Sequence, residues 1–381
     1  MTAIRRSLAY SIADSYLALP LQLVGTMIIS RLLTPAETGV FAVAAVFAAF
    51  ASTFRDFGVA EYLIQENELD AEKIRAALTV NIAISWAMAL LLFFFAPLAA
   101  DFYRSQGVAE VMRVQAFNFI LIPFGAVTMA YFRRELDFRP MFIAGLLANL
   151  TTFVVAILCA FWGFGYMSLA WSSLAGVVVT VGTSIWFRPA GFPKWPGVRG
   201  IVRVINFGKF ATGIYFFGQL GKGAPEMIIG RAQDMVGVAL FSRGSGLVEL
   251  FNRTVLRAVM PVCMPYFAQN NRQTGSMISG YLMSVSYLTA IGWPFLAFMG
   301  IVAYAAIRIV YGSQWMASVP LAQILCAAGA IELIHYLAKE ALIAGGDVKR
   351  SNLLQIVIQG GRIAGLFAVI PFGLIGPCWG L

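Results

Sequence analysis

The side chains with the clearest chemical use are cations that lie within apolar stretches of the sequence. Arg31, Arg55, Arg243 and Arg253 each lie in such a stretch, and Lys222 lies deep in another. A guanidinium group keeps its charge and can donate two parallel hydrogen bonds to phosphate oxygens, whereas an ammonium acts as a point charge. We therefore predict that these residues bind an anionic group, with the four arginines as the main contacts.

Carboxylates and the single histidine lie in stretches of the same kind. Asp14, Asp56, Glu226 and His335 are candidates for binding a coupling cation or for carrying a proton. Structural alternatives stay open: His335 could make a polar contact only, and Glu226 has the helical spacing for an ion pair with Lys222.

Helical spacing predicts further ion pairs within the apolar stretches. Glu249 and Arg253 are four residues apart, and a second group shares roughly one helical face: Glu332, His335, Lys339 and Glu340. Such pairs would neutralise charge rather than bind a ligand. Arg31, Arg257 and Arg362 lie near the ends of their stretches and could instead extend their charge to lipid headgroups.

The sequence contains no recognisable catalytic motif. It has no P-loop, no nucleophile elbow and no paired carboxylates, and the single histidine argues against a metal site. The four cysteines are far apart in apolar surroundings, so they are typical of small core residues. We expect a protein that is not an enzyme and has no catalytic residues, metal or cofactor.

Composition defines the class of protein. Of the 381 residues, 60% are hydrophobic and 12% are charged, whereas a soluble domain carries about 25% charged residues. A cytosolic enzyme, a secreted domain and a disordered chain are therefore excluded, and a polytopic membrane protein remains. The net charge of +9 would suggest nucleic acid in a soluble protein. Here it divides between loops and spans, so no nucleic-acid partner is expected.

Hydropathy predicts eleven membrane spans, all helical because each is too long and too apolar for a barrel strand. The first is interpreted as a retained span, since no small-residue cleavage site follows it. The predicted spans are 8–32, 38–60, 76–99, 111–132, 141–162, 166–187, 206–230, 236–267, 277–302, 317–343 and 352–371.

The loop charges predict the orientation. If the N-terminus is inside, most Lys and Arg residues of the loops lie on the same side as Arg5 and Arg6. Only Arg104, Arg113, Arg231 and Arg308 lie on the other side. Because cytoplasmic loops carry the excess of basic residues, we expect a cytoplasmic N-terminus.

The chain also contains an internal repeat. The pattern Y-x-S-Q-x4-V-x3-Q begins at Tyr103 and again at Tyr311. It predicts two matched six-helix bundles, 1–187 and 206–381, joined by a basic cytoplasmic linker, 188–205. The second copy stops near the start of a twelfth helix, so we expect it to be truncated. Parallel repeats of this kind are typical of V-shaped alternating-access transporters.

Several segments resemble polysaccharide-export flippases, which belong to the superfamily of multidrug, oligosaccharidyl-lipid and polysaccharide exporters. The matching segments are SRLLTPAETGVFAVAAVF (30–47), FRDFGVAEYLIQE (54–66), RRELDF (133–138), GFGYMSLAW (163–171), IIGRAQDMVGVALFSRGSGL (228–247) and VYGSQWMASVPLAQIL (310–325). The resemblance covers nearly the whole chain.

The resemblance implies two helical bundles around a cationic cavity in the bacterial inner membrane. The implied substrate is an undecaprenyl-pyrophosphate-linked oligosaccharide, moved outward for exopolysaccharide or surface antigen assembly. In related peptidoglycan-precursor flippases an arginine of the second helix is functionally important, and Arg55 lies beside that position. Arg31 matches a basic residue that closes the first helix. The sequence departs from the family pattern just before the IIGR turn. The acidic residue that the resemblance leads us to expect there is displaced, and Pro225 and Glu226 occupy that place.

Two other functions stay open. A cation-coupled drug exporter of the same superfamily would depend on carboxylates within its spans, but here bases outnumber acids there. A membrane-embedded glycan polymerase or acyltransferase would need a large outer loop with acid–base residues, and the predicted outer loops are short. Membrane lipids, the lipid-linked oligosaccharide and other membrane proteins of polysaccharide assembly are the expected partners.

Overall fold

The computed structural model describes residues 20–55, 58–66, 68–256, 259–260, 263, 266–267, 278–344 and 348–369. These residues form helices and short connections, and no strand occurs among them. The chain divides into two compact units, Met1–Gln219 and Leu220–Leu381, and the division falls inside helix α9 (Ile201–Ala232). The predicted boundary at the linker 188–205 stays a prediction.

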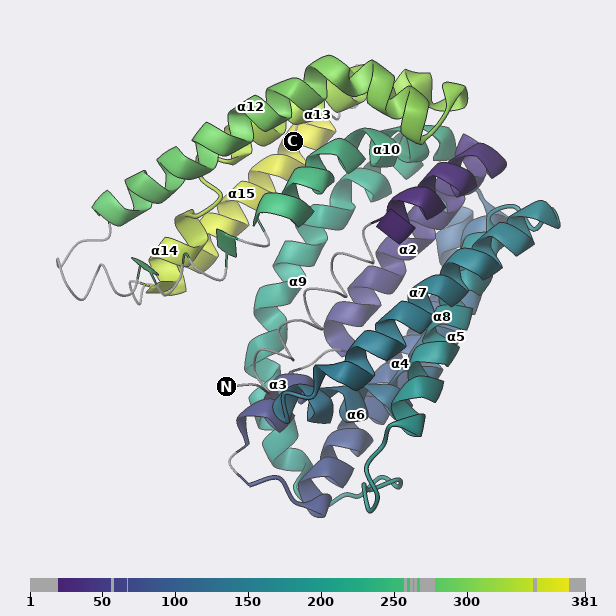
Figure 1. Ribbon diagram of the computed structural model, residues 1–381, viewed down its shortest axis with the longest axis vertical. Coiled ribbons are helices and arrows are strands. Elements are labelled where there is room, and N and C mark those ends of the chain that lie inside the picture. Colours follow the sequence, from purple (N-terminus) through teal and green to yellow (C-terminus); the bar gives the residue numbers. More distant parts are fainter. Residues whose placement is uncertain are drawn as a thin grey trace. The chain divides into compact units, whose positions relative to one another are not determined.

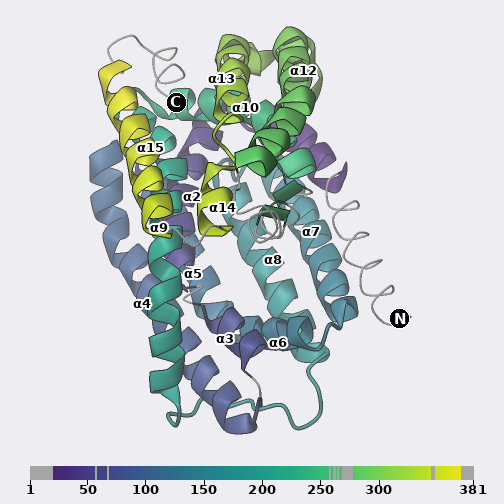
Figure 2. The same cartoon turned by 90° about the vertical axis from the view of Figure 1, so that its left-hand side faces the viewer.

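Unit 1 is built from antiparallel helices that follow a helical segment at 20–32. They are α2 (Pro35–Arg55), α3 (Val59–Gln65), α4 (Ala71–Tyr103), α5 (Gln106–Leu121), α6 (Pro123–Arg134), α7 (Phe138–Phe161), α8 (Met167–Trp186) and the first part of α9. Helix α5 packs against α2, α4 and α8, and α7 lies along α8, as Figures 1 and 2 show.

Local capping explains where these helices begin. Thr34 and Glu37 form a reciprocal capping box at the start of α2: the Glu37 carboxylate accepts from the Thr34 N–H (2.8 Å), and Thr34 Oγ1 accepts from the Glu37 N–H (3.3 Å). Pro35 then occupies the first helical position, which needs no N–H donor. Asp70 caps α4 by accepting from the Lys73 N–H at 2.8 Å.

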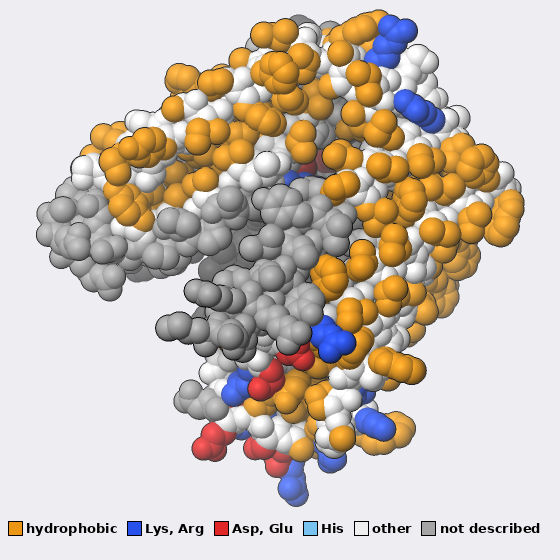
Figure 3. Space-filling model, viewed as in Figure 1, with side chains coloured by type: hydrophobic (Ala, Val, Ile, Leu, Met, Phe, Trp, Pro, Cys, Tyr) orange, Lys and Arg blue, Asp and Glu red, His pale blue; other side chains and the backbone are white. Residues whose placement is uncertain are grey.

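The connections of unit 1 alternate between two ends. At one end Gly165, with φ of +52°, lies against the Glu37 carboxylate, and Tyr166 donates to Glu110 (2.8 Å). At the other end the connections after α3, α6 and α8 meet. Acidic and basic side chains gather at this second end in Figure 3, so we call it the charged end.

Within the part of the chain that the structure describes, six helical segments are long and apolar enough to cross a membrane, or seven if the bent pair α5–α6 is one span. They are Pro35–Gln65, Ala71–Tyr103, Phe138–Phe161, Met167–Trp186, Ile278–Val310 and Ser313–Glu332. The expectation of a multi-pass membrane protein is thus confirmed, and apolar side chains cover the surface over α7 and α12 (Figure 3). The count of eleven spans stays a prediction.

One predicted span, 111–132, is bent rather than straight. Helices α5 and α6 meet at an angle of 52°, and Pro123 is the first residue of α6. Proline has no N–H and its ring clashes with the preceding turn, so a continuous helix cannot pass through it without a kink. The bend directs α6 across α3 and α4, against which it packs.

Unit 2 repeats part of this arrangement. After α9 it contains α10 (Met235–Phe251), the π-helical turn η1 (Asn252–Leu256), α12 (Ile278–Val310), the 3-10 turn η2 (Ser313–Ser318), α13 (Val319–Glu332), α14 (Ala338–Ala344) and α15 (Val348–Val369). Helix α13 packs against α10 and α12, as α5 packs against α2 and α4 in unit 1.

The repeated tyrosine motif ends a long helix in both units. Tyr103 and Tyr311 are buried at the end of the long helices α4 and α12, and the next residue has a positive φ in each case, 52° for Arg104 and 104° for Gly312. The two turns differ in detail, because Arg104 is in the left-handed helical region (ψ 39°) whereas Gly312 is extended (ψ 174°). The shared burial of the tyrosines at the ends of the long helices supports the internal repeat read from the sequence.

The predicted span 317–343 is broken between α13 and α14. Trp293 and Tyr281 of α12 donate to the carbonyls of Ala330 (2.9 Å) and Ile334 (3.1 Å). Because those carbonyls are engaged, the N–H groups of Ile334 and Ala338 bond to residues three positions back instead of four. The ladder of the α-helix is interrupted where side chains insert into it.

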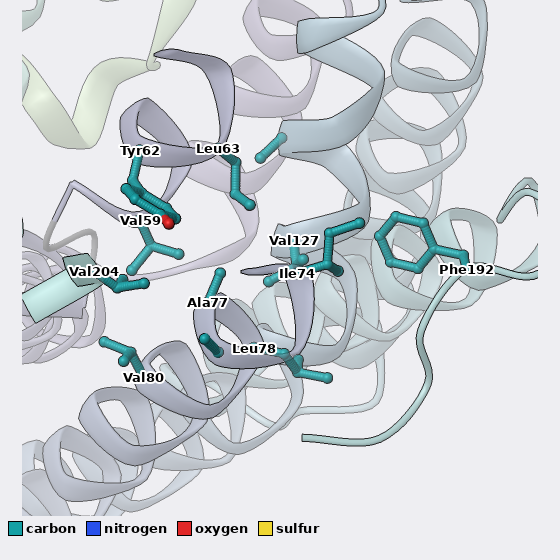
Figure 4. Close-up of a cluster of buried hydrophobic side chains, with 12 residues drawn as sticks. Val59, Tyr62, Leu63, Ile74, Ala77, Leu78, Val80, Val127, Phe192 and Val204 are labelled. Atoms are coloured by element: carbon teal, nitrogen blue, oxygen red, sulfur yellow. The ribbon is translucent and has the colours of Figure 1, made fainter. Parts of the chain in front are cut away.

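A buried apolar cluster joins the elements at the charged end of unit 1 (Figure 4). Its members come from α3, α4 and α6, from the α8–α9 connection and from the start of α9. Leu63 is 1% exposed within it, and replacing a buried leucine by alanine costs about 2–5 kcal/mol. The cluster therefore fixes the short helix α3 against α4 and α6.

Candidate functional site

Unit 1 contains a cavity of about 340 Å³ at its charged end. This size lies near the lower limit of ordinary ligand pockets. Its polar lining residues are Arg55, Glu61, Asn81 and Arg133, and its apolar wall includes Val59, Leu63, Val127 and Ala130 of the buried cluster. The same packing that holds α3 in position thus also shapes the cavity.

Arg55 lines this cavity and is one of the predicted site residues. It is the last residue of α2, where the partial negative charge of the helix end favours a cation. The side chain is half-buried, and its guanidinium lies 5.7 Å from the ring centre of Phe119. Gly58, with φ of 66°, then allows the chain to turn into α3.

Arg133 lines the cavity with Arg55, although sequence reasoning counted it only as a loop charge. It belongs to the last turn of α6. The neighbouring Arg134 has a different task, because it donates to the Leu63 carbonyl at 2.7 Å and also to the Glu66 carbonyl at the end of α3. The signal that could have indicated Arg133 is its place in the RRELDF segment, which the flippase resemblance includes.

The remaining polar groups give the cavity a mixed character. Asn81 is 5% exposed and accepts a hydrogen bond from Ser85 (3.3 Å). Glu61 is an exposed side chain of α3. Two guanidinium groups against one carboxylate leave a net positive lining. Such a site can bind phosphate oxygens through the arginines and accept hydrogen bonds from hydroxyl groups through Glu61.

An ion pair stabilises the connection between α3 and α4 beside the cavity. Lys73 Nζ lies 2.8 Å from Glu66 Oε1 and also donates to the Glu68 carbonyl at 2.6 Å. The hydrogen bond from Lys73 holds the pKa of the Glu66 carboxyl below its usual range. The connection is therefore fixed by one ammonium group that binds both the Glu66 carboxylate and the Glu68 carbonyl.

Arg31 does not share the cavity with Arg55. It is an exposed residue at the end of the helical segment 20–32, next to the start of α2. Helix α2 has 21 residues, which corresponds to roughly 30 Å at a rise of about 1.5 Å per residue. The two arginines thus lie at opposite ends of α2 and cannot bind one phosphate group together in this structure.

Arg243 contacts two aromatic rings of unit 2. Its guanidinium carbon lies 5.1 Å from the ring centre of Tyr311 and 4.9 Å from that of Trp315, which is within the range of cation–π attraction. Its Nε is buried and makes no hydrogen bond to the residues that the structure describes. The contacts attach α10 to the turn that follows α12.

Arg253 forms the ion pair that helical spacing predicts. Its Nε lies 3.0 Å from Glu249 Oε1, so the prediction of the Glu249–Arg253 pair is confirmed. Arg243 and Arg253 are separated along α10 and η1 by roughly 15 Å, taking about 1.5 Å per residue. Within unit 2 they therefore have separate surroundings.

The other predicted residues are distributed as follows. Glu226 lies in α9 with a buried Oε2 that has no hydrogen-bond partner in the described part of the chain. His335 is exposed in the break between α13 and α14.

Glu332, predicted to share a face with His335 and Lys339, pairs with Arg362 at 3.4 Å. Asp14, Asp56 and the side chain of Lys222 lie outside the described residues, so the pairing of Lys222 with Glu226 stays a prediction.

A family of polysaccharide biosynthesis proteins matches residues 28–320. The chain belongs to this family. Among the curated members of similar sequence, ExoT of Rhizobium meliloti (strain 1021), a succinoglycan biosynthesis transport protein, is 24% identical over 84% of this chain and 65% of its own length. TuaB of Bacillus subtilis (strain 168), a teichuronic acid biosynthesis protein, is 22% identical over 78% and 62%. The chain thus spans less than two thirds of both relatives.

A third relative is covered more fully. WzxC of Escherichia coli (strain K12), a lipopolysaccharide biosynthesis protein, is 22% identical over 94% of this chain and 75% of its own length. These relatives confirm the resemblance of the chain to polysaccharide-export proteins that its sequence motifs indicate.

Solved structures confirm the predicted fold class. The lipid II flippase MurJ in an inward closed conformation superimposes with a TM-score of 0.80 at 11% identity, over 98% of this chain and 84% of MurJ. An inward-facing multidrug resistance MATE transporter of the MOP superfamily gives 0.68 at 16% identity, over 94% and 89%. The family member therefore has the all-α fold of these membrane transporters.

Proposed function

We propose that the chain is a flippase for an undecaprenyl-pyrophosphate-linked oligosaccharide. It would act in the bacterial inner membrane during the assembly of exopolysaccharide or surface polysaccharide. Family membership, the name of ExoT as a transport protein and the MurJ-like fold support this proposal. The observation that carries it is the cavity in which Arg55 and Arg133 lie together.

The two arginines would hold the pyrophosphate group. Each guanidinium can donate a pair of parallel hydrogen bonds, so two of them match the several oxygens of a pyrophosphate. A volume of about 340 Å³ suits a headgroup but not a whole oligosaccharide. The first sugar would lie beside Glu61, whose carboxylate can accept hydrogen bonds from its hydroxyls. The lipid tail would stay in the bilayer.

During transport the headgroup would then contact the remaining cations one after another rather than all at once. Arg31, at the far end of α2, would receive the headgroup after Arg55 has released it. That Arg243, Arg253 and Lys222 face the same pathway is part of the proposal. Asp14, Asp56, Glu226 and His335 stay the candidates for coupling, and the buried Oε2 of Glu226 supports Glu226 among them.

The test compares variants in a strain that needs the exported polymer. R55A and R133A should each lower export roughly tenfold or more, because charge-assisted hydrogen bonds to the headgroup are lost. R55K should rescue only partly, since lysine keeps the charge but not the paired donors. R139A is the matched control: Arg139 is exposed at the same end and does not line the cavity. Normal export by R55A and R133A at normal expression would contradict the proposed site.

The lipid-linked intermediate distinguishes the rival functions. A flippase deletion traps the complete lipid-linked oligosaccharide on the cytoplasmic leaflet. A polymerase or acyltransferase deletion leaves unmodified product on the outer leaflet. A drug exporter would change drug resistance on overexpression and would leave the lipid-linked intermediate where it is.

A further inference from the structure

The connection between α8 and α9 is held firmly although it has no regular structure. Gly197 donates to Thr79 Oγ1 (2.9 Å), and the same hydroxyl donates to the Gly197 carbonyl (2.8 Å). A Cβ at Gly197 would lie 2.9 Å from the Cβ of Arg75, so only glycine allows this close approach to α4. Figures 1 and 2 show the connection running across the charged end of unit 1.

A second anchor lies at the start of the connection. Arg188 donates to the Phe124 carbonyl (2.6 Å) and to Thr128 Oγ1 (3.1 Å) of α6, and its guanidinium lies 5.5 Å from the ring centre of Phe192. Phe192 is buried and packs on Tyr131 of α6. These two anchors, together with the hydrogen bond from the Gly197 N–H to the Arg75 carbonyl (3.3 Å), hold the backbone of the connection in place.

From this connection and from the first turns of α9, apolar and basic side chains extend outward together. Trp195 and Val198 are each 78% exposed, Val202 is 70% exposed and Ile205 is 44% exposed. Lys194 and Arg199 are exposed among them. We call these six residues the α8–α9 surface. The run 188–206 contains no Asp or Glu.

We propose that the α8–α9 surface binds anionic phospholipid headgroups. Trp195 and Val198 would enter the headgroup region, and Lys194 and Arg199 would contact lipid phosphates. The surface would thus attach the charged end of unit 1 to one leaflet. This inference does not depend on which molecule the protein transports.

The chemistry of the surface favours a lipid over a protein partner. Tryptophan is enriched at membrane–water interfaces because its ring is apolar and its N–H is polar. Basic residues beside it are attracted to anionic lipids. The surface lies at the ends of the membrane-length helices α4 and α8, and the ends of membrane-spanning helices lie at the level of the headgroups.

The first experiment measures whether Trp195 contacts lipid. The full chain is reconstituted in liposomes of phosphatidylcholine with or without phosphatidylglycerol, using brominated versions of each lipid as quenchers. The fluorescence of Trp195 is obtained by subtracting the emission of W195F from that of the parent protein. We expect brominated phosphatidylglycerol to quench this difference at least twofold more than brominated phosphatidylcholine, and the excess should fall in high salt. W162F is the control, since Trp162 is 72% exposed at the opposite end.

The second experiment measures retained phosphatidylglycerol by native mass spectrometry. K194Q/R199Q should bind it roughly 30-fold more weakly, because each basic residue near an anionic surface is worth about a fivefold change in affinity. R104Q/R113Q neutralises two exposed arginines at the opposite end and should change retention little.

Three outcomes would overturn the proposal. One is equal quenching of Trp195 by the two brominated lipids. Another is unchanged phosphatidylglycerol retention in K194Q/R199Q. The third is a change of oligomeric state in that variant with lipid retention unchanged, which would identify the surface as a protein contact.

Discussion

At the scale of residues, sequence position alone does not distinguish the arginines that line the cavity from those that do not. The sequence predicts Arg55 as a binding residue because a charged side chain within a membrane span is costly and usually has a function. Arg133 places a second guanidinium group in the same cavity. In the sequence, however, it is one of many basic residues in the predicted cytoplasmic loops, so its position does not indicate a binding role. Only the bend before α6 and the packing of α3 bring Arg133 to Arg55, and those depend on contacts distant in sequence.

The strained residue Arg104 gives a prediction about stability. Its φ of 52° is unfavourable for a side chain with a Cβ, whereas Gly312 occupies the matching position of the repeat. R104G should raise the free energy of unfolding by about 0.5–1 kcal/mol, the strain relieved less the entropy that glycine adds. G312A should lower it by about 1–3 kcal/mol, because only glycine adopts its conformation readily. Thermal unfolding in detergent measures both, and a destabilised R104G would contradict the argument.

The Glu66–Lys73 pair gives a prediction about pH. The pKa of Glu66 is lowered in the folded state by the hydrogen bond from Lys73. Its contribution to stability is therefore fully present above the ordinary pKa of a glutamate and is lost as pH falls through the lowered value. The difference in melting temperature between the parent protein and E66Q should be constant near neutral pH and shrink in acid. Adding salt should reduce it as well, and a difference that grows in acid would be inconsistent with the pair.

At the scale of elements, hydropathy predicts helices better than it predicts their interruptions. The predicted spans 76–99 and 166–187 correspond closely to α4 (Ala71–Tyr103) and α8 (Met167–Trp186), because an apolar run of sufficient length has few other solutions in a membrane. The break between α13 and α14 has no proline or glycine to announce it. It results from donors of α12 that lie about forty to fifty residues earlier in the sequence.

Removing those donors should change the break itself. In Y281F/W293F the carbonyls of Ala330 and Ile334 are released, so they can accept from the N–H groups four residues on, as in an ordinary helix. We expect slower hydrogen exchange at Ile334 and Ala338 together with a loss of about 0.5–1.5 kcal/mol per removed bond. Y287F is the matched control, because Tyr287 belongs to the same helix and is 65% exposed. Exchange that speeds up throughout α13 would indicate general unfolding and contradict a specific role.

At the scale of the whole molecule, the two units use one packing scheme with different polar content. Where unit 1 has Phe47 against Tyr103, with ring centres 6.0 Å apart, unit 2 has Arg243 against Tyr311. A repeat fixes which helices touch but not which side chains fill the contact. The fold was therefore accessible from the repeat and the hydropathy, whereas the surroundings of each charged residue were not.

Orientation is the property on which the direction of transport depends. The cavity with Arg55 and Arg133 opens the proposed pathway at the charged end, so that end must face the cytoplasm if substrate is loaded there. In a variant without native cysteines, a membrane-impermeant thiol reagent should label R104C in intact cells. K194C, at the charged end, should react only after the inner membrane is permeabilised. Both positions are exposed, so accessibility within the protein is matched. The reverse labelling pattern would place the Arg55 cavity outside the cell, where it could release a lipid-linked headgroup but could not collect one.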